Sequence, residues 1–291
     1  MQHGRFQRSL CGVVAITSVA SGLEVSYEHY KGSYSNPVMY SPLLLSGALA
    51  GAGALGVVSR WGARVVLRYV SIATLLDGAI GFGFHVRGVA RKPGGWKLPV
   101  TNIVMGPPIF APLLFGTSAY LGMMASYLRR EGERDDASDV ARTAPDSTAT
   151  KRDWREDLRY GRFQKHLSAL TIAWAFFSGF EALYSHYKSR FRYKAQWTPV
   201  LLTPILMASA AAAIFSRRMA KTLLPAVSVL ALADGAAGFG YHVRGIVRRP
   251  GGTKKPLYNI LYGPPIFAPL LFAACGFLGV LASLLRREGE R

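Results

Sequence analysis

Acidic and imidazole side chains occur inside apolar stretches of this sequence, where ionisable groups are costly. Glu24 and His29 lie in the first stretch, and Asp77 and His85 lie in the third. The same residue types return 157 positions later as Glu181, His186, Asp234 and His242. An acid within a membrane is expensive unless it is paired or neutral, which makes it a functional hypothesis by default. We predict an intramembrane polar site from these residues in each half, near the outer face, or one composite site between the halves.

Carboxylates and histidines at this depth would suit three kinds of chemistry. They could carry protons or ions in a transport or channel-like protein, which is the function that we predict. Alternatively, His29 and His85 could ligate haem b in a haem- or quinone-linked electron-transfer subunit, with the nearby glycines admitting the ring. A mixed carboxylate and imidazole metal site is the third possibility. Glu24 and His29 lie about 140° apart around a helix, so we predict no metal site.

A structural role is the remaining alternative for the same side chains. Glu24 and Asp77 would then tie helices together through polar partners, and the chain would serve as a membrane partner within a larger complex. No nucleophile elbow, Walker loop, HExxH, CxxC or Rossmann fingerprint is present in the sequence. An enzyme of the soluble type is therefore not indicated.

Basic residues directly follow two of the histidines. Arg87 and Arg91 come after His85, and the sequences H-V-R-G and R-x-P-G-G return unchanged around Arg244 and Arg248. A basic surface with almost no acidic counterpart attracts anions, including lipid headgroups. A charge cluster at helix ends is most often a solvated collar. Any Lys or Arg would suffice for a collar, however, so the exact retention of these sequences keeps specific contacts with anions or headgroups as the alternative.

Proline, glycine and asparagine follow the basic residues. We expect an irregular loop from 86 to 101. Pro107 is expected in the first turn of the fourth helix, where a missing N–H is harmless, with Asn102 capping that helix. Asn259 and Pro264 occupy the same positions in the second half. These four residues are predicted to shape the loop.

Four apolar helices, repeated once, must position these residues. The stretch 77–115 returns as 234–272, and 28 of the 39 aligned positions are identical. The expected helices are 9–30, 38–58, 65–84, 106–130, 166–187, 198–215, 222–241 and 263–285. We predict an all-α, polytopic membrane protein formed by tandem duplication, with eight transmembrane helices in two parallel four-helix repeats. The repeats would cover 1–131 and 162–291, joined by a flexible polar linker at 132–161.

Charge and composition agree with a bilayer partner. Half of the 291 residues are hydrophobic, and the net charge of +19 comes from short clusters between apolar runs, so we predict no nucleic-acid partner. The first apolar run follows Arg5 and Arg8 as in a signal peptide, yet it returns in mid-chain and is predicted to be a helix. On the side of the termini and linker lie 21 of the 35 Lys and Arg. This predicts an inner (plasma) membrane protein with cytoplasmic termini, able to contact other membrane subunits.

Overall fold

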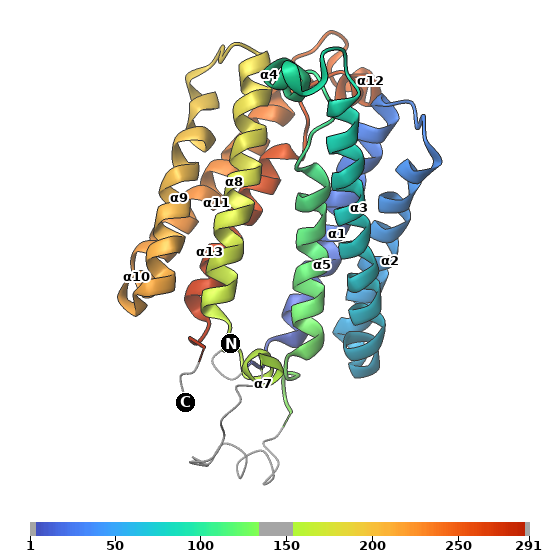
Figure 1. The fold of residues 1–291 in the computed structure, drawn as a ribbon. Coiled ribbons are helices and arrows are strands. Elements are labelled where there is room, and N and C mark those ends of the chain that lie inside the picture. The colour runs from blue at the N-terminus through green and yellow to red at the C-terminus, as the bar shows by residue number, and fades with distance from the viewer. Residues whose placement is uncertain (1–3, 134–153, 289–291) are drawn as a thin grey trace.

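The chain forms long helices that run side by side (Figure 1). The computed structural model describes residues 4–133 and 154–288, and all regular secondary structure within these ranges is helical. The all-α prediction is thus confirmed. The long helices are α1 (Gln7–Lys31), α2 (Ser41–Val58), α3 (Leu67–Ala90), α5 (Ala111–Tyr127), α8 (Gln164–Lys188), α9 (Thr198–Phe215), α11 (Leu223–Val247) and α13 (Ala268–Leu284).

Shorter helices connect the long ones. They are α4 (Pro99–Val104), α7 (Trp154–Arg159), α10 (Arg217–Lys221) and α12 (Pro256–Leu261). Single turns of 3-10 helix occur at η1 (Pro37–Tyr40), η3 (Gly95–Lys97), η4 (Lys194–Trp197) and η5 (Gly252–Lys254), and a π turn, η2 (Gly62–Val66), precedes α3. The connections that contain α4 and α12 lie at one end of the molecule, and α7, the start of α1 and the end of α13 lie at the other (Figure 1).

Six helices in the described ranges are long and apolar enough to cross a membrane. These are α1, α8, α2 with η1, α3 with η2, α9 with η4, and α11 with α10. Such helices are those of an integral, multi-pass membrane protein. The fourth helix of each predicted repeat, α5 or α13, has 17 residues and reaches about 26 Å at the usual helical rise. Eight spans therefore stay a prediction.

Each long helix packs on neighbours that are close to it in the sequence. In the first half of the chain, α1 packs on α2 and α5, and α3 packs on α5 and α2. In the second half, α8 packs on α9 and α13, and α11 packs on α13 and α9. Glycine permits some of these approaches, because a Cβ at Gly53 of α2 would lie 2.8 Å from the backbone nitrogen of Ala15 on α1.

A shared apolar core joins the two groups of helices. It contains Leu10 and Leu67 from the first group, Leu167 and Leu278 from the second, and Leu158 of α7 between them. All five side chains are at most 6 % exposed. Because burial of apolar surface is the main favourable term in packing, this core holds the halves together near the α7 end.

Two expectations about element boundaries are wrong. The loop expected at 86–101 is largely helical, since α3 continues to Ala90 and α4 begins at Pro99. No proline occurs between His85 and Pro93, so the basic segment after His85 can keep its helical hydrogen bonds. The fourth helix begins at Ala111 rather than at 106. Of the expected linker, 134–153 lies outside the described residues, and its last part contains α7.

Candidate functional site

Two glutamates lie where the two groups of helices meet. The carboxyl of Glu24 on α1 faces the backbone N–H of Phe267, the N-cap residue of α13. The carboxyl of Glu181 on α8 faces the N–H groups of Phe110 and Ala111 at the start of α5. Each acid thus reaches the N-terminus of a helix in the opposite group, where the helix dipole favours negative charge.

One oxygen of each glutamate is buried without a hydrogen-bond partner, namely Oε2 of Glu24 and Oε1 of Glu181. The two acids also interact electrostatically with each other and with Glu28. Glu28 lies further out on α1, at 3.5 Å from the ammonium of Lys31. Three carboxyls therefore lie near the C-terminal ends of α1 and α8, and the unpartnered oxygens leave capacity for a proton.

Aromatic rings cluster on Phe110, whose N–H faces Glu181, but not on Phe267, whose N–H faces Glu24. Phe110 stacks on Phe177 of α8 with a centroid distance of 4.6 Å and makes edge contacts with Phe180 and Phe176. At the equivalent position, Phe267 has one ring neighbour, Phe239 at 6.5 Å. The sequence explains this difference, because the first helix has Val19, Ala20 and Leu23 where α8 has phenylalanines. The helix start that faces Glu181 therefore carries more aromatic contacts than the helix start that faces Glu24.

Three of the predicted histidines are held by backbone carbonyls. Nδ1 of His85 lies 2.5 Å from the carbonyl oxygen of Pro108, and Nδ1 of His29 lies 2.6 Å from that of Met39. His242 makes the same contact with Pro265 at 2.6 Å. A carbonyl only accepts, so Nδ1 carries a proton in each of these three rings.

The histidines are also near each other within each group. His29 and His85 are close enough to interact electrostatically, and so are His186 and His242. The ring of His186 lies 6.2 Å from that of Phe191. The described residues contain no group of three or more His, Cys, Asp or Glu that could hold a metal ion.

The two aspartates are hydrogen-bonded to hydroxyl groups at the start of a neighbouring helix. Ser41 Oγ donates to Oδ1 of Asp77 at 2.6 Å, which joins α3 to the start of α2. Thr198 and Asp234 make the corresponding contact in the second group. The structure therefore brings the histidines together within each group, directs the glutamates to the opposite group, and directs the aspartates to the second helix of their own group.

The predicted loop residues make defined contacts. Asn102 lies inside α4, where its Nδ2 donates to the carbonyls of Pro93 at 3.1 Å and Gly95 at 2.7 Å, so it ties the loop rather than capping the fourth helix. Pro107 packs over Gly88 of α3, where an added Cβ would lie 3.0 Å from the proline ring. The second group repeats these contacts with Asn259 on Pro250 and Gly252, and with Pro264 over Gly245.

A set of charged contacts at the α7 end was missed by sequence reasoning. Arg130, which is 3 % exposed, donates to the carbonyls of Gly56 at 3.1 Å and Val57 at 2.7 Å, the last residues of α2. Arg287 binds Ala213 and Ile214 at the end of α9 in the same way. These arginines satisfy helix carbonyls that have no partner within their own helix.

A glutamate next to each arginine caps the first helix of its group. Glu131 accepts from the backbone N–H groups of Arg8 at 2.7 Å and Ser9 at 3.1 Å, and Glu288 accepts from those of Lys165 and His166. The signal that could have revealed these contacts is the sequence LRREGER, which occurs at 128–134 and again at 285–291.

Comparison with known protein families, with curated proteins and with solved structures finds no match to this chain. Its class therefore follows from its own features. It is an integral, multi-pass, all-helical membrane protein with carboxyl and imidazole groups inside its apolar helices.

Proposed function

We propose that the chain consists of two parallel four-helix units, 1–131 and 162–291, with eight membrane-spanning helices in all. Contacts that recur at a separation of 157 residues support this proposal, among them those of the histidines, the loop asparagines and the LRREGER arginines. α5 and α13 are apolar and lie among longer helices, so a short span is sufficient for them. The arrangement corresponds to a duplicated membrane protein with a pseudo-twofold axis along the membrane normal.

We infer that the protein conducts or transports protons or small cations along the boundary between the two units. The observation that carries this proposal is the pair Glu24 and Glu181, each with a buried oxygen that has no partner. A carboxyl in a membrane interior is expensive, and such groups commonly mark ion or proton pathways. Glu28, which is ion-paired with Lys31, lies beyond the two glutamates at the outer end of this boundary and adds a third carboxyl near the pair.

The arrangement of the two units supports movement at this boundary. They share an apolar core near the α7 end, whereas towards the other end the glutamates and Phe110 connect them. A carboxylate that faces helix N–H groups is stabilised as an anion, and protonation weakens that attraction. Protonation of Glu24 or Glu181 would thus loosen the contact between units and couple the proton to a rocking motion.

Proton flux into vesicles tests this function. The purified protein is reconstituted with an internal pH dye, and flux is started by a potassium diffusion potential. We expect Glu24→Gln and Glu181→Gln together to reduce flux at least about tenfold, since Gln keeps the shape but cannot release a proton. Asp77→Asn, on a residue bound to Ser41, is the matched control and should retain most of the flux. Unchanged flux in a correctly folded double variant contradicts the proposal.

A second candidate function is ligation of a cofactor such as haem b by His29 and His85. It is favoured by the carbonyl bonds to both Nδ1 atoms, because metal-ligating histidines usually donate their other N–H to a fixed acceptor. The chain would then be an electron-transfer subunit. A visible spectrum of protein purified from haem-supplied cells tests this candidate, and the lack of a Soret band excludes it.

We also propose that the α7 end faces the cytoplasm of a cell with the protein in its inner membrane. The support is the larger number of Lys and Arg on that side, 21 against 14. Single cysteines introduced at Arg60 and Arg190 in a variant without Cys11 and Cys275 distinguish the two faces. A membrane-impermeant thiol reagent added to whole cells should label position 190 and not position 60.

A further inference from the structure

Large apolar side chains are exposed on α4 and α12, at the end of the molecule where the long helices turn. Val100 of α4 and Leu257 of α12 are each 69 % exposed, and Trp96 just before α4 is 51 % exposed. Tyr262 at the end of α12 is also exposed. Both short helices lie level with the ends of the long helices (Figure 1). Aromatic and apolar groups at this level are typical of the boundary between the lipid chains and the headgroups.

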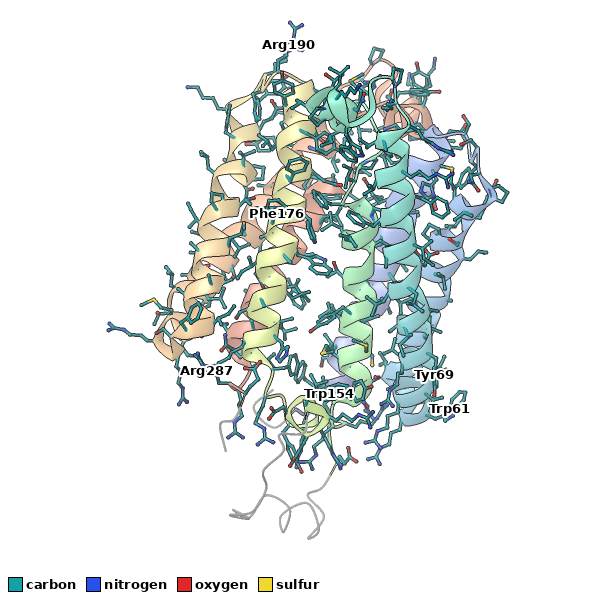
Figure 2. The ribbon with its side chains drawn as sticks, viewed as in Figure 1. Trp61, Tyr69, Trp154, Phe176, Arg190 and Arg287 are labelled. Atoms are coloured by element: carbon teal, nitrogen blue, oxygen red, sulfur yellow. The ribbon has the colours of Figure 1, made fainter. Side chains whose placement is uncertain are left out.

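Basic residues surround these apolar groups almost without acidic ones. The connections 28–40, 85–110, 185–197 and 242–267 contain 14 Lys and Arg, and their one acid, Glu28, is bonded to Lys31. Arg87 and Arg91 are exposed at the end of α3. Arg190 lies at the same end of the molecule (Figure 2). This end therefore carries a strong positive field that selects anionic partners.

The basic loops have a fixed shape. Asn102 is 4 % exposed and bonds two loop carbonyls, while Gly94 adopts a left-handed conformation with φ of 80°. Asn259 and Gly251, with φ of 85°, repeat this arrangement. A loop that is ordered before binding loses less entropy when it binds. Such loops present their cations at constant positions, beyond the needs of a solvated surface.

We propose that the segments 87–105 and 244–262, here called the two loop surfaces, bind the headgroups of anionic phospholipids. The exposed side chains of α4 and α12 enter the outer part of the acyl layer, and the Arg and Lys side chains contact the lipid phosphates. The mixture of apolar groups and cations favours a lipid over an acidic protein, because a lipid offers both an acyl chain and an anionic phosphate. This inference does not depend on the transport function.

Quenching of Trp96 by brominated lipids tests the proposal in the full-length protein. Trp61, Trp154, Trp174 and Trp197 are replaced by Phe, and the protein is placed in nanodiscs containing brominated phosphatidylglycerol or brominated phosphatidylcholine. We expect stronger quenching by the anionic lipid. In this background, Arg91→Gln with Lys97→Gln should reduce the preference about fivefold for each charge removed. Arg60→Gln with Arg64→Gln, at the α7 end, is the matched control and should leave the preference unchanged.

The second loop surface provides an independent check. Thr253 occupies the position of Trp96, so Trp96→Thr combined with Thr253→Trp moves the probe to η5, just before α12, and should show the same preference. Equal quenching by both lipids, or an unchanged preference in the Arg91 and Lys97 variant, overturns the proposal. Absence of quenching by either lipid also overturns it, because Trp96 then does not contact the acyl layer. If the four-Trp replacement does not fold, native mass spectrometry of the wild-type protein must show retained phosphatidylglycerol in excess of phosphatidylcholine.

Discussion

Arg130→Ala should destabilise the first four-helix group more than any exposed arginine change. The guanidinium bonds the carbonyls of Gly56 and Val57 at 3.1 and 2.7 Å, and it is almost fully buried. A hydrogen bond from a charged donor contributes about 1.5–3 kcal/mol. Water can reach part of this helix end after the change, so we take the lower figure for each bond and expect a loss of about 3 kcal/mol.

The measurement is reversible unfolding in mixed micelles, with the free energy obtained from a titration with SDS. Arg60→Ala is the matched control, since its side chain is 55 % exposed and lies 3.9 Å from Glu133. Exposed ion pairs of this kind contribute about 0–1 kcal/mol. The loss in free energy of unfolding for Arg130→Lys should lie between those of Arg130→Ala and Arg60→Ala. An ammonium keeps the charge but cannot place two donors as the planar guanidinium does.

Hydrogen exchange locates the effect. Loss of the arginine should increase exchange in the last turn of α2, whose carbonyls it binds, before exchange rises in α3. The reasoning is refuted if Arg130→Ala costs no more than Arg60→Ala. It is also refuted if the loss is as large as expected but exchange at the end of α2 does not change.

Three further changes test other contacts. Burial raises the pKa of Glu131, but backbone N–H donors at the start of α1 outweigh this effect and hold the pKa below its usual value. The stabilisation by this carboxylate is therefore complete above about pH 4.3, the unfolded pKa, and is lost as pH falls through the lowered folded pKa. Glu131→Gln should thus flatten the pH dependence of the unfolding midpoint. Asn102→Ala should cost about 2 kcal/mol and speed tryptic cleavage after Lys97, because two loop carbonyls lose their donor. Ser41→Ala should cost about 1–2 kcal/mol, since Asp77 loses a bond of 2.6 Å, and the further change Asp77→Asn should recover part of that loss.

The sequence predicted which segments are helical because each apolar run has the length that a membrane requires. It was wrong about the end of the third helix, where Arg87 and Arg91 follow a histidine and suggest a loop. Local charge does not stop a helix when its backbone hydrogen bonds can continue, and α3 extends to Ala90. It also missed Arg130, since a charge at a helix end resembles a solvated side chain until the opposing carbonyls are known.

The structure differs from the sequence expectation in how the candidate residues are paired. Glu24 was expected near Asp77 and His85, and it instead faces Phe267 of the other group. Asp77 is bound by Ser41, and His85 by the carbonyl of Pro108. The functional roles of these residues stay predictions.

The sequence alone determined the apolar length of the main helices and the positions of Glu24, Glu181 and the histidines along the helix axes. The position of a residue along a helix axis follows from its sequence number, because the rise per residue is constant. Burial in lipid follows from the hydrophobicity of the side chains. Only the tertiary structure decided which face of each helix meets which neighbour. Rotation about a helix axis is set by side-chain packing between helices, and this directed the two glutamates across the boundary to the start of α13 and α5.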